Sequence, residues 1–318
     1  MTARAREDRP LHGSVALVTG GGRGLGRVLA QALAGAGAAV GVTGRSADDL
    51  CETVRLIEAA GGVAAGASAD VTDEAATTQA LGELRRRLGP VDVLINNAGI
   101  NGPIGPLWDV PPEEWWRTLE VNLRGVVACT RLVLPDMLAR RRGRIVNLTS
   151  NAGVFRWPGV SAYSVSKAAV VKLSENLAAE VRREGVSVFS FHPGLLPIGL
   201  TEAALAADAP PDSPEGRVAA WARRQFAEGR GADPDRAARL VVRLAAGRGD
   251  SLSGRHLSVH DDLDLLLERL DDIRRDDLCT LRLRELRPAA HPALPPYPAE
   301  SISAFVSSAG GGVGHTLR

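Results

Sequence analysis

The chain has 318 residues, of which 45% are apolar and 24% charged, a balance typical of globular proteins with a substantial core. A formal net charge of +1 excludes the strongly basic or acidic field that would indicate nucleic acid or an anionic membrane surface as a partner. The N-terminus, MTARAREDRP, lacks the apolar core of a secretory signal and no stretch is long and apolar enough to span a bilayer, so we expect a soluble cytoplasmic protein.

Short β-branched runs alternate with Ala-, Leu- and Arg-rich stretches of helical period over the first 260 residues. The runs are SVALVTG, AAVGVTG, VDVLINN, GRIVNLTS and GVSVFSFHPG, and the helical stretches cover 24–36, 47–60, 73–88, 113–141 and 161–184. This alternation predicts a doubly wound, Rossmann-type α/β fold over residues 11–262: a parallel sheet of about seven strands with helices on both faces.

The segments around this block differ from it in composition. We expect residues 1–10 to be flexible, and the Pro-rich stretch near 208–216 to belong to a substrate lid over about 195–230. An amphipathic, charged stretch predicts a helical extension over 263–287, and the Pro-, Ala- and Ser-rich residues 288–318 are expected to be disordered. The three cysteines, Cys51, Cys129 and Cys279, show no metal-ligand spacing, so we expect reduced thiols and no metal site.

The first β-run leads directly into a glycine-rich turn. VALVTGGGRGLG places Gly20, Gly24 and Gly26 between this run and the next helical stretch. Small residues there let a pyrophosphate approach the helix N-terminus, where free N–H groups favour negative charge. Glycine-rich turns without ligands also occur, but the strand before and the helix after this turn favour a nucleotide site.

The two lysines of the chain stand close together, although it has 38 basic residues. Lys167 and Lys172 both lie in SAYSVSKAAVVKLSE, and Tyr163 precedes Lys167 by four residues, so these two side chains share a helix face. A nearby ammonium lowers the pKa of a tyrosine from its ordinary value near 10, which suits an acid–base group. Ser150 ends a predicted strand and is placed to hold a reacting oxygen, whereas Lys172 is expected to lie on the surface.

Five ordered motifs resemble those of the short-chain dehydrogenase/reductase family. The spacing Thr-Gly-x-x-x-Gly-x-Gly, from Thr19 to Gly26, is followed by ADVTD at 69–73, NNAG at 96–99, the Tyr163/Lys167 pair and HPG at 192–194. The resemblance covers about residues 11–260. It implies hydride transfer with a nicotinamide dinucleotide.

The resemblance also implies roles for individual residues. It makes Ser150, Tyr163 and Lys167 catalytic, with Asn122 as a proton relay that connects the lysine to solvent. It places Asp70 against the adenine and NNAG around the adenine-ribose pocket. The cofactor-binding residues that it implies are Thr19, Gly20, Arg23, Gly24, Leu25, Gly26, Arg45, Ser46, Asp70, Val71, Asn97, Ala98, Gly99, Lys167, Pro193 and Gly194.

The end of the second β-run indicates which cofactor is preferred. Sites for NAD(H) usually carry an acidic residue there, but this chain has Gly44, Arg45 and Ser46. A guanidinium suits a 2′-phosphate in charge and geometry, and Arg23 offers a second positive contact, so we expect NADP(H) rather than NAD(H). Arg45 as a solvated surface residue stays the alternative.

Other signals are weaker. Phe155 and Trp157 follow Ser150 and either line a substrate pocket or pack in the core. His192 is interpreted as structural rather than catalytic. The stretches 113–141 and 161–184 carry enough apolar residues to bury a second face, which favours a homodimer or homotetramer.

We therefore expect an NADP(H)-dependent carbonyl reductase, or the reverse alcohol dehydrogenase, that acts on a small-molecule substrate with Tyr163 as acid and base. Two alternatives stay open. One is a non-reducing enzyme of the same family, such as a dehydratase or epimerase, and the other is a nucleotide-sensing binding protein without turnover.

Overall fold

The computed structural model describes residues 9–206 and 209–282. The expected disordered tail at 288–318 and most of the expected flexible N-terminus lie outside these residues. None of the described helices is long and apolar enough to cross a membrane.

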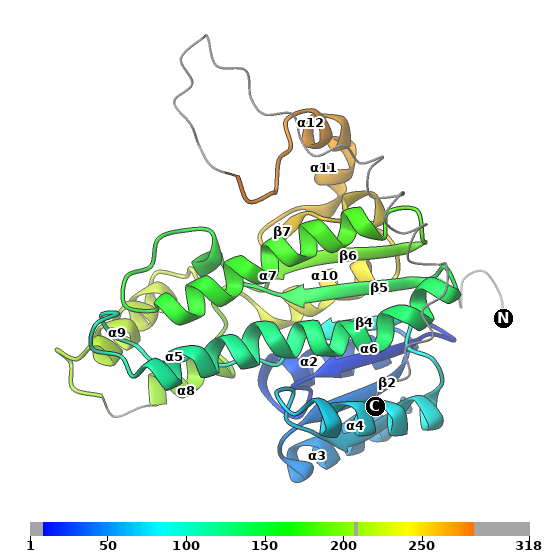
Figure 1. Cartoon of the computed structure of the whole chain (residues 1–318), viewed down its shortest axis with the longest axis horizontal. Helices are drawn as coiled ribbons and strands as arrows, with labels where there is room; N and C mark the ends of the chain where they lie inside the picture. The colour runs from blue at the N-terminus through cyan, green and yellow to red at the C-terminus, as the bar shows by residue number, and fades with distance from the viewer. Residues whose placement is uncertain (1–8, 207–208, 283–318) are drawn as a thin grey trace, which may run out of the picture. The chain divides into compact units, whose positions relative to one another are not determined.

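Seven parallel strands form one sheet in the order β3-β2-β1-β4-β5-β6-β7 (Figure 1). Their bounds are β1 Val15–Thr19, β2 Ala39–Gly44, β3 Val63–Ser68, β4 Val93–Asn96, β5 Gly143–Leu148, β6 Val186–His192 and β7 His256–Ser258. The predicted doubly wound sheet is confirmed. Because β1 pairs with both β2 and β4, the strand order reverses between β1 and β4, and a crevice opens there at the carboxyl edge of the sheet.

Helices connect the strands and cover both faces of the sheet. The main helices are α2 Gly24–Gly35, α3 Ala47–Ala59, α4 Glu74–Leu88, α5 Pro112–Leu119, α6 Gly125–Ala139, α7 Ser161–Glu180 and α10 Pro234–Ala245. The segment after β6 holds α8 Leu200–Ala206 and α9 Pro214–Ala227, and the chain continues after β7 with α11 Leu263–Glu268 and α12 Leu270–Arg275.

Three predicted helical stretches differ from the observed elements. The stretch 113–141 is interrupted by a π-helical turn, η1 Glu120–Arg124, between α5 and α6. The stretch 161–184 ends early, because α7 stops at Glu180 and the chain turns back through Gly185 at φ 70°. The expected helical extension after residue 262 is two short helices, and its last residues, 283–287, lie outside the described part of the chain.

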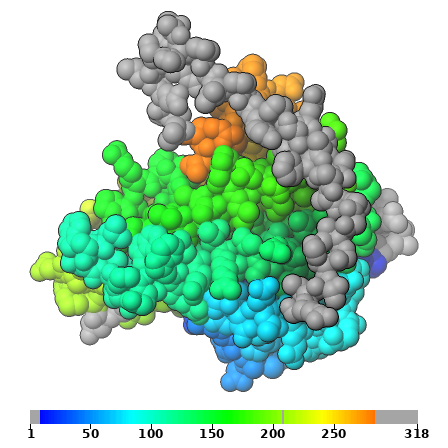
Figure 2. Space-filling model, viewed as in Figure 1, coloured from blue at the N-terminus to red at the C-terminus, as the bar shows by residue number. Residues whose placement is uncertain are grey.

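The core is divided between the two faces of the sheet. One cluster packs α2, α3 and α10 against it, with Leu29 and Leu244 among the completely buried side chains. The other cluster packs α4, α6 and α7 on the opposite face, around Cys129 and Met137. The surface of α6 and α7, which lie over this second face, is the green area at the centre of Figure 2. The burial of Cys129 agrees with the expected packed thiol.

A buried polar network fixes α7 against the centre of the sheet. The Asn96 side-chain amide at the end of β4 donates to Asn147 Oδ1 at 2.8 Å, and Asn147 Nδ2 donates to Ser174 Oγ on α7 at 2.9 Å. Ser174 Oγ donates in turn to the carbonyl oxygen of Val170. Hydrogen bonds between buried groups are directional, so this network sets the position of α7 along β5 more closely than apolar packing alone.

Replacing Asn147 by Ala is expected to lower the free energy of unfolding by about 2 kcal/mol, because two buried hydrogen bonds are lost and a small cavity forms. Urea denaturation followed by circular dichroism measures this. Thr78→Ala on the exposed surface of α4 is the control and should change stability by less than about 0.5 kcal/mol. Equal effects of the two substitutions would contradict the role given to the network.

Candidate active site

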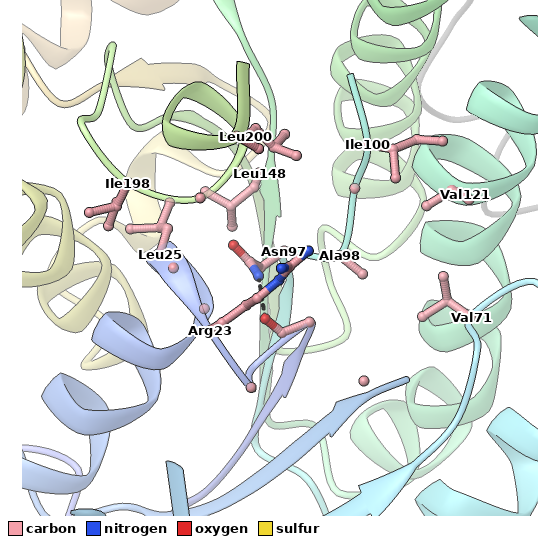
Figure 3. A pocket seen from close by; sticks show the side chains of 18 of the residues that line it. Arg23, Leu25, Val71, Asn97, Ala98, Ile100, Val121, Leu148, Ile198 and Leu200 are labelled. Atoms are coloured by element: carbon pink, nitrogen blue, oxygen red, sulfur yellow. Dashed lines mark hydrogen bonds between the residues drawn. The ribbon is translucent and has the colours of Figure 1, made fainter. Parts of the chain in front are cut away.

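A cavity of about 710 Å³ lies at the carboxyl edge of the sheet, above the reversal between β1 and β4 (Figure 3). It is lined by the glycine-rich turn, the segments that follow β2, β3 and β4, the start of α7 and the segment that follows β6. Segments far apart in the sequence therefore meet at one place, as the strand order requires. All but one of the predicted cofactor residues line this cavity.

The glycine-rich turn has the conformation that a phosphate needs. Gly20 and Gly24 adopt φ values of 63° and 52°, which disfavour residues with a side chain. A Cβ at Gly26 would lie 2.0 Å from the carbonyl oxygen of Gly20, so the helix can pack against the turn only with glycine there. No side chain caps α2 and its first turn carries no acidic residue, which leaves its N-terminal N–H groups for an anion. The turn therefore fits a pyrophosphate.

Thr19 is the predicted cofactor residue that does not line the cavity. Its buried hydroxyl accepts hydrogen bonds from the backbone N–H groups of Asn97 and Ala98, at 3.0 and 3.1 Å. The Asn97 side chain, labelled in Figure 3, points into the cavity region and donates to the backbone carbonyl oxygens of Thr19 and Gly20. Thr19 therefore joins the turns after β1 and β4, and these turns form the cavity wall.

The β2 and β3 end of the cavity is charged. Arg45 and Ser46, which follow β2, lie there, and the Ser46 side chain also caps α3 by accepting from the N–H of Asp49. The Asp70 carboxylate accepts two hydrogen bonds from Thr72 and pairs with Arg117 at 3.0 Å. Burial opposes ionisation of Asp70, but the hydrogen bonds from Thr72 and the Arg117 guanidinium together hold its pKa below the ordinary value.

Lys167 and Tyr163 line the β4 and β5 half of the cavity. Lys167 is only 5% exposed, and its Nζ donates a hydrogen bond to the carbonyl oxygen of Leu148 at 2.9 Å. Nζ lies 5.6 Å from the centre of the Tyr163 ring. Burial lowers the pKa of Lys167 to about 8.

Tyr163 differs from the sequence-based expectation in its acidity. The sequence argument predicted that the lysine would lower the pKa of Tyr163, but burial disfavours the phenolate and raises it above the ordinary value. A hydrogen bond with Ser150 acts in the opposite direction and is the smaller effect. The phenol is therefore protonated at neutral pH.

Ser150 and Asn122 stand next to lining residues without lining the cavity themselves. Ser150 directly follows β5, and its Oγ also accepts from the N–H of Ala152 at 3.2 Å. The Asn122 amide pairs with both backbone groups of Ile100, at 2.9 Å each, and donates to Ser166 on α7. The π-turn brings Asn122 to this position, where it clamps the segment after NNAG to α7.

Gly99 separates Asn122 from Lys167. A Cβ at Gly99 would lie 3.2 Å from Asn122 Oδ1 and 3.7 Å from Lys167 Nζ. Both polar groups therefore border the same backbone position, although no direct hydrogen bond joins them among the described contacts. The expected neighbourhood of Asn122 and Lys167 is observed, and the relay itself stays a prediction.

The segment after β6 covers the cavity from the other side. Pro193 and Gly194 line it, and the start of the expected lid touches the glycine-rich turn, since a Cβ at Gly24 would lie 3.0 Å from Gly199 Cα. The Asn101 side chain donates to the carbonyl oxygen of Leu200 at 3.1 Å and ties the lid to the segment after β4.

Sequence reasoning missed several lining residues, because they belong to no motif. Most are apolar: Ile100, Val121, Leu148, Leu196, Ile198 and Leu200. Arg117 was also missed, since only the fold brings it to Asp70, which is 47 positions away. Lys172 is exposed and pairs with Glu175, as expected. His192 is largely buried, and burial, assisted by His256 and His260, lowers its pKa to about 4, in keeping with a structural role.

The reversal of strand order and the glycine-rich turn beside it define an α/β protein of the dinucleotide-binding class. The family model for short chain dehydrogenases matches residues 14–208, more than half of the chain. The chain belongs to this family of oxidoreductases.

Similar proteins agree with the family assignment. A short chain dehydrogenase of Pseudocercospora fijiensis is 40% identical over 186 residues, which are 58% of this chain and 60% of that protein. The 2-dehydro-3-deoxy-L-rhamnonate dehydrogenase (NAD(+)) of Sphingomonas is 40% identical over 57% of this chain and 71% of its own length. A crystal structure of an actinorhodin polyketide ketoreductase variant with NADPH superposes with a TM-score of 0.71 at 32% identity, covering 77% of this chain and 95% of that chain.

The burial of Lys167 predicts a stability that rises with pH. Below pH 8 the lysine is charged in the folded and the unfolded chain, and its burial cost is present in full. Between about 8 and its ordinary pKa of 10.5, the folded protein binds fewer protons than the unfolded chain, so stability increases. Relative to Lys167→Met, the wild type should gain about 2 kcal/mol in free energy of unfolding between pH 7.5 and 9.5.

Urea denaturation at both pH values measures this gain. Lys172→Met, which removes the exposed lysine, should show no such pH-dependent difference from the wild type. A difference between wild type and Lys167→Met that is flat with pH would mean that the ammonium is well solvated.

Proposed function

We propose that the protein is an NADP(H)-dependent oxidoreductase that interconverts a carbonyl and a secondary alcohol, with Tyr163 as the acid and base. The observation that carries the proposal is the arrangement around the cavity. One half has a glycine-rich turn and cationic side chains suited to the phosphates of a dinucleotide, and the other half has a buried lysine beside a tyrosine with a protonated phenol.

The cofactor would be held by residues already described. The glycine-rich turn and the N-terminus of α2 take the pyrophosphate, Asp70 and Val71 border the adenine, and the segment 97–99 borders the ribose. Lys167 lines the same cavity and would hold the ribose beside the nicotinamide, and Pro193 and Gly194 would border the nicotinamide end of the site. The nicotinamide, when bound, supplies the hydride in reduction and accepts it in oxidation.

The residues of the chain handle the proton. In reduction, Tyr163 donates its phenolic proton to the substrate oxygen, and burial supports this role because it keeps the phenol protonated at neutral pH. Ser150 hydrogen bonds to Tyr163 and holds the same oxygen. Lys167, charged at pH 7, stabilises the phenolate that remains after the transfer. Asn122 keeps the neighbouring backbone in place and supports proton relay to the lysine.

Two arginines support a preference for NADP(H). Arg45 follows β2 at the place where an acidic residue would hold a ribose 2′-hydroxyl, and Arg23 lies in the glycine-rich turn of the same cavity. Their guanidinium groups match a 2′-phosphate in charge and geometry. Among the similar proteins, the ketoreductase was solved with NADPH and the Sphingomonas enzyme is named for NAD(+), so the arginines of this chain carry the proposal.

Replacing Tyr163 by Phe should reduce kcat for carbonyl reduction by at least about 100-fold, because the proton donor is lost, while the dissociation constant of NADPH changes less than about threefold. Stopped-flow absorbance at 340 nm and fluorescence titration measure the two quantities. Turnover that survives the substitution would remove Tyr163 from the mechanism.

Replacing Arg45 by Gln should weaken NADPH about 10- to 100-fold, since a charge-assisted contact to the 2′-phosphate is lost, and should leave the affinity for NADH nearly unchanged. Fluorescence titration with both nucleotides measures the effect, and Arg55→Gln on the outer surface of α3 is the matched control. Equal weakening of both nucleotides would argue against a specific phosphate contact.

A further inference from the structure

We propose that the substrate is a neutral, largely apolar ketone or secondary alcohol that carries an aromatic ring, and that sugar acids are poor substrates. This inference rests on the proposed function and names its substrate class. Three features of the described residues support it: the distribution of charge along the cavity, the composition of its reactive half, which is the half that holds Tyr163 and Lys167, and exposed aromatic side chains in the loop between Ser150 and α7.

Charged side chains are gathered at one half of the cavity. Those that line it are Arg23, Arg45, Asp49, Asp70, Arg117 and Lys167. The first four follow β1, β2 or β3, and Arg117 is paired with Asp70. Five of the six therefore belong to the half of the cavity formed by the segments after β1, β2 and β3, which is the half proposed to hold the dinucleotide. Lys167 is the remaining one; its buried Nζ donates to the carbonyl oxygen of Leu148, and the proposed function assigns its other N–H groups to the cofactor ribose. No cation among the described lining residues is therefore placed to bind a substrate carboxylate.

Apolar side chains line the reactive half. Leu148 ends β5 directly before Thr149 and Ser150, Ile100 follows the NNAG segment, and Ile198 and Leu200 come from the lid. Figure 3 shows Ile198, Leu148 and Leu200 on one side of the cavity and Ile100 on the other. A carboxylate placed against these side chains loses its hydration without gaining a hydrogen-bond or ionic partner, whereas an apolar group is favoured there.

Exposed aromatic side chains occur in the loop that follows the cavity-lining residues Leu148 and Thr149, and on α9. The loop over 151–160 joins Ser150 to α7, so a substrate whose carbonyl reaches Tyr163 lies beside this loop. Phe155 in the loop is 67% exposed, which excludes the expected alternative of core packing. Trp157 in the same loop packs against Trp221 on α9, with ring centres 5.0 Å apart, and Trp221 is still 39% exposed. Aromatic groups left accessible in this way indicate a binding surface for apolar or aromatic ligands.

One cation, Arg156, stands between these aromatic residues. Its side chain is exposed and does not line the cavity. If it bound a substrate carboxylate, the protein would favour acids and Arg156→Gln would lower activity on them. The proposal requires instead that Arg156→Gln does not lower the small activity on a sugar acid and leaves activity on a neutral ketone unchanged within about twofold.

The test compares two ketones of similar size with the wild-type protein and NADPH. We expect kcat/KM for 2-acetylnaphthalene to exceed that for 5-ketogluconate at least 100-fold. Because turnover depends on the proposed function as well, calorimetric titration of both ketones into the protein saturated with NADP⁺ gives an independent readout, with the aryl ketone bound at least 100-fold more tightly.

Phe155→Ser should raise the dissociation constant and KM of the aryl ketone about 5- to 30-fold with little change in kcat. Leu265→Ser, which removes a comparably exposed side chain on α11, should change neither. Two results overturn the inference. One is tighter binding of the sugar acid than of the aryl ketone, and the other is a Phe155→Ser protein whose sedimentation mass changes while its ketone binding does not. An aryl ketone that binds as expected but is never reduced leaves the inference standing and refutes the proposed function.

Discussion

A buried ammonium group organises the reactive half of this protein. The hydrogen bond from Lys167 Nζ to the carbonyl oxygen of Leu148 joins α7 to the end of β5, and the network from Asn96 through Asn147 to Ser174 holds the same helix about two turns further along. Tyr163 precedes the lysine on the same face, so its phenol is placed by these contacts as well. Burial of the Lys167 ammonium lowers the stability of the fold at neutral pH, and the same burial places its positive charge beside the Tyr163 phenol.

The cavity is divided by the sheet beneath it. The lining residues that follow β1, β2 and β3 include Gly20, Arg45 and Asp70, whereas those at or after the ends of β4, β5 and β6 include Ile100, Leu148 and Leu196. This division follows from the reversal of strand order, which brings two halves of different composition to one crevice. Phosphates need charged or polar partners when they leave water, whereas a neutral reacting group is accommodated by apolar side chains. The first half of the cavity provides the polar partners and the second half the apolar ones.

Much of this arrangement could be predicted from the sequence, because its motifs reflect the local backbone conformation and the local side-chain spacing. The glycines of the first turn and the Tyr163/Lys167 pair are recognisable without a fold, and so is the alternation that predicts the sheet. The remaining features depend on contacts between distant segments. Burial raises the pKa of Tyr163, the π-turn carries Asn122 to Ile100, and Arg117 meets Asp70 only through packing, so no local pattern reveals them. Thr19 belongs to a motif, yet its hydroxyl supports a neighbouring turn.

We propose that hydride transfer and proton transfer occur together in this cavity. The most direct test of this mechanism is the mass of the alcohol formed from 2-acetylnaphthalene, or from any ketone that is consumed, with NADPH that carries deuterium at both C4 positions. We expect one deuterium on the former carbonyl carbon and a proton from solvent on the oxygen. A product without deuterium on that carbon, or substrate converted without oxidation of the nucleotide, would contradict it.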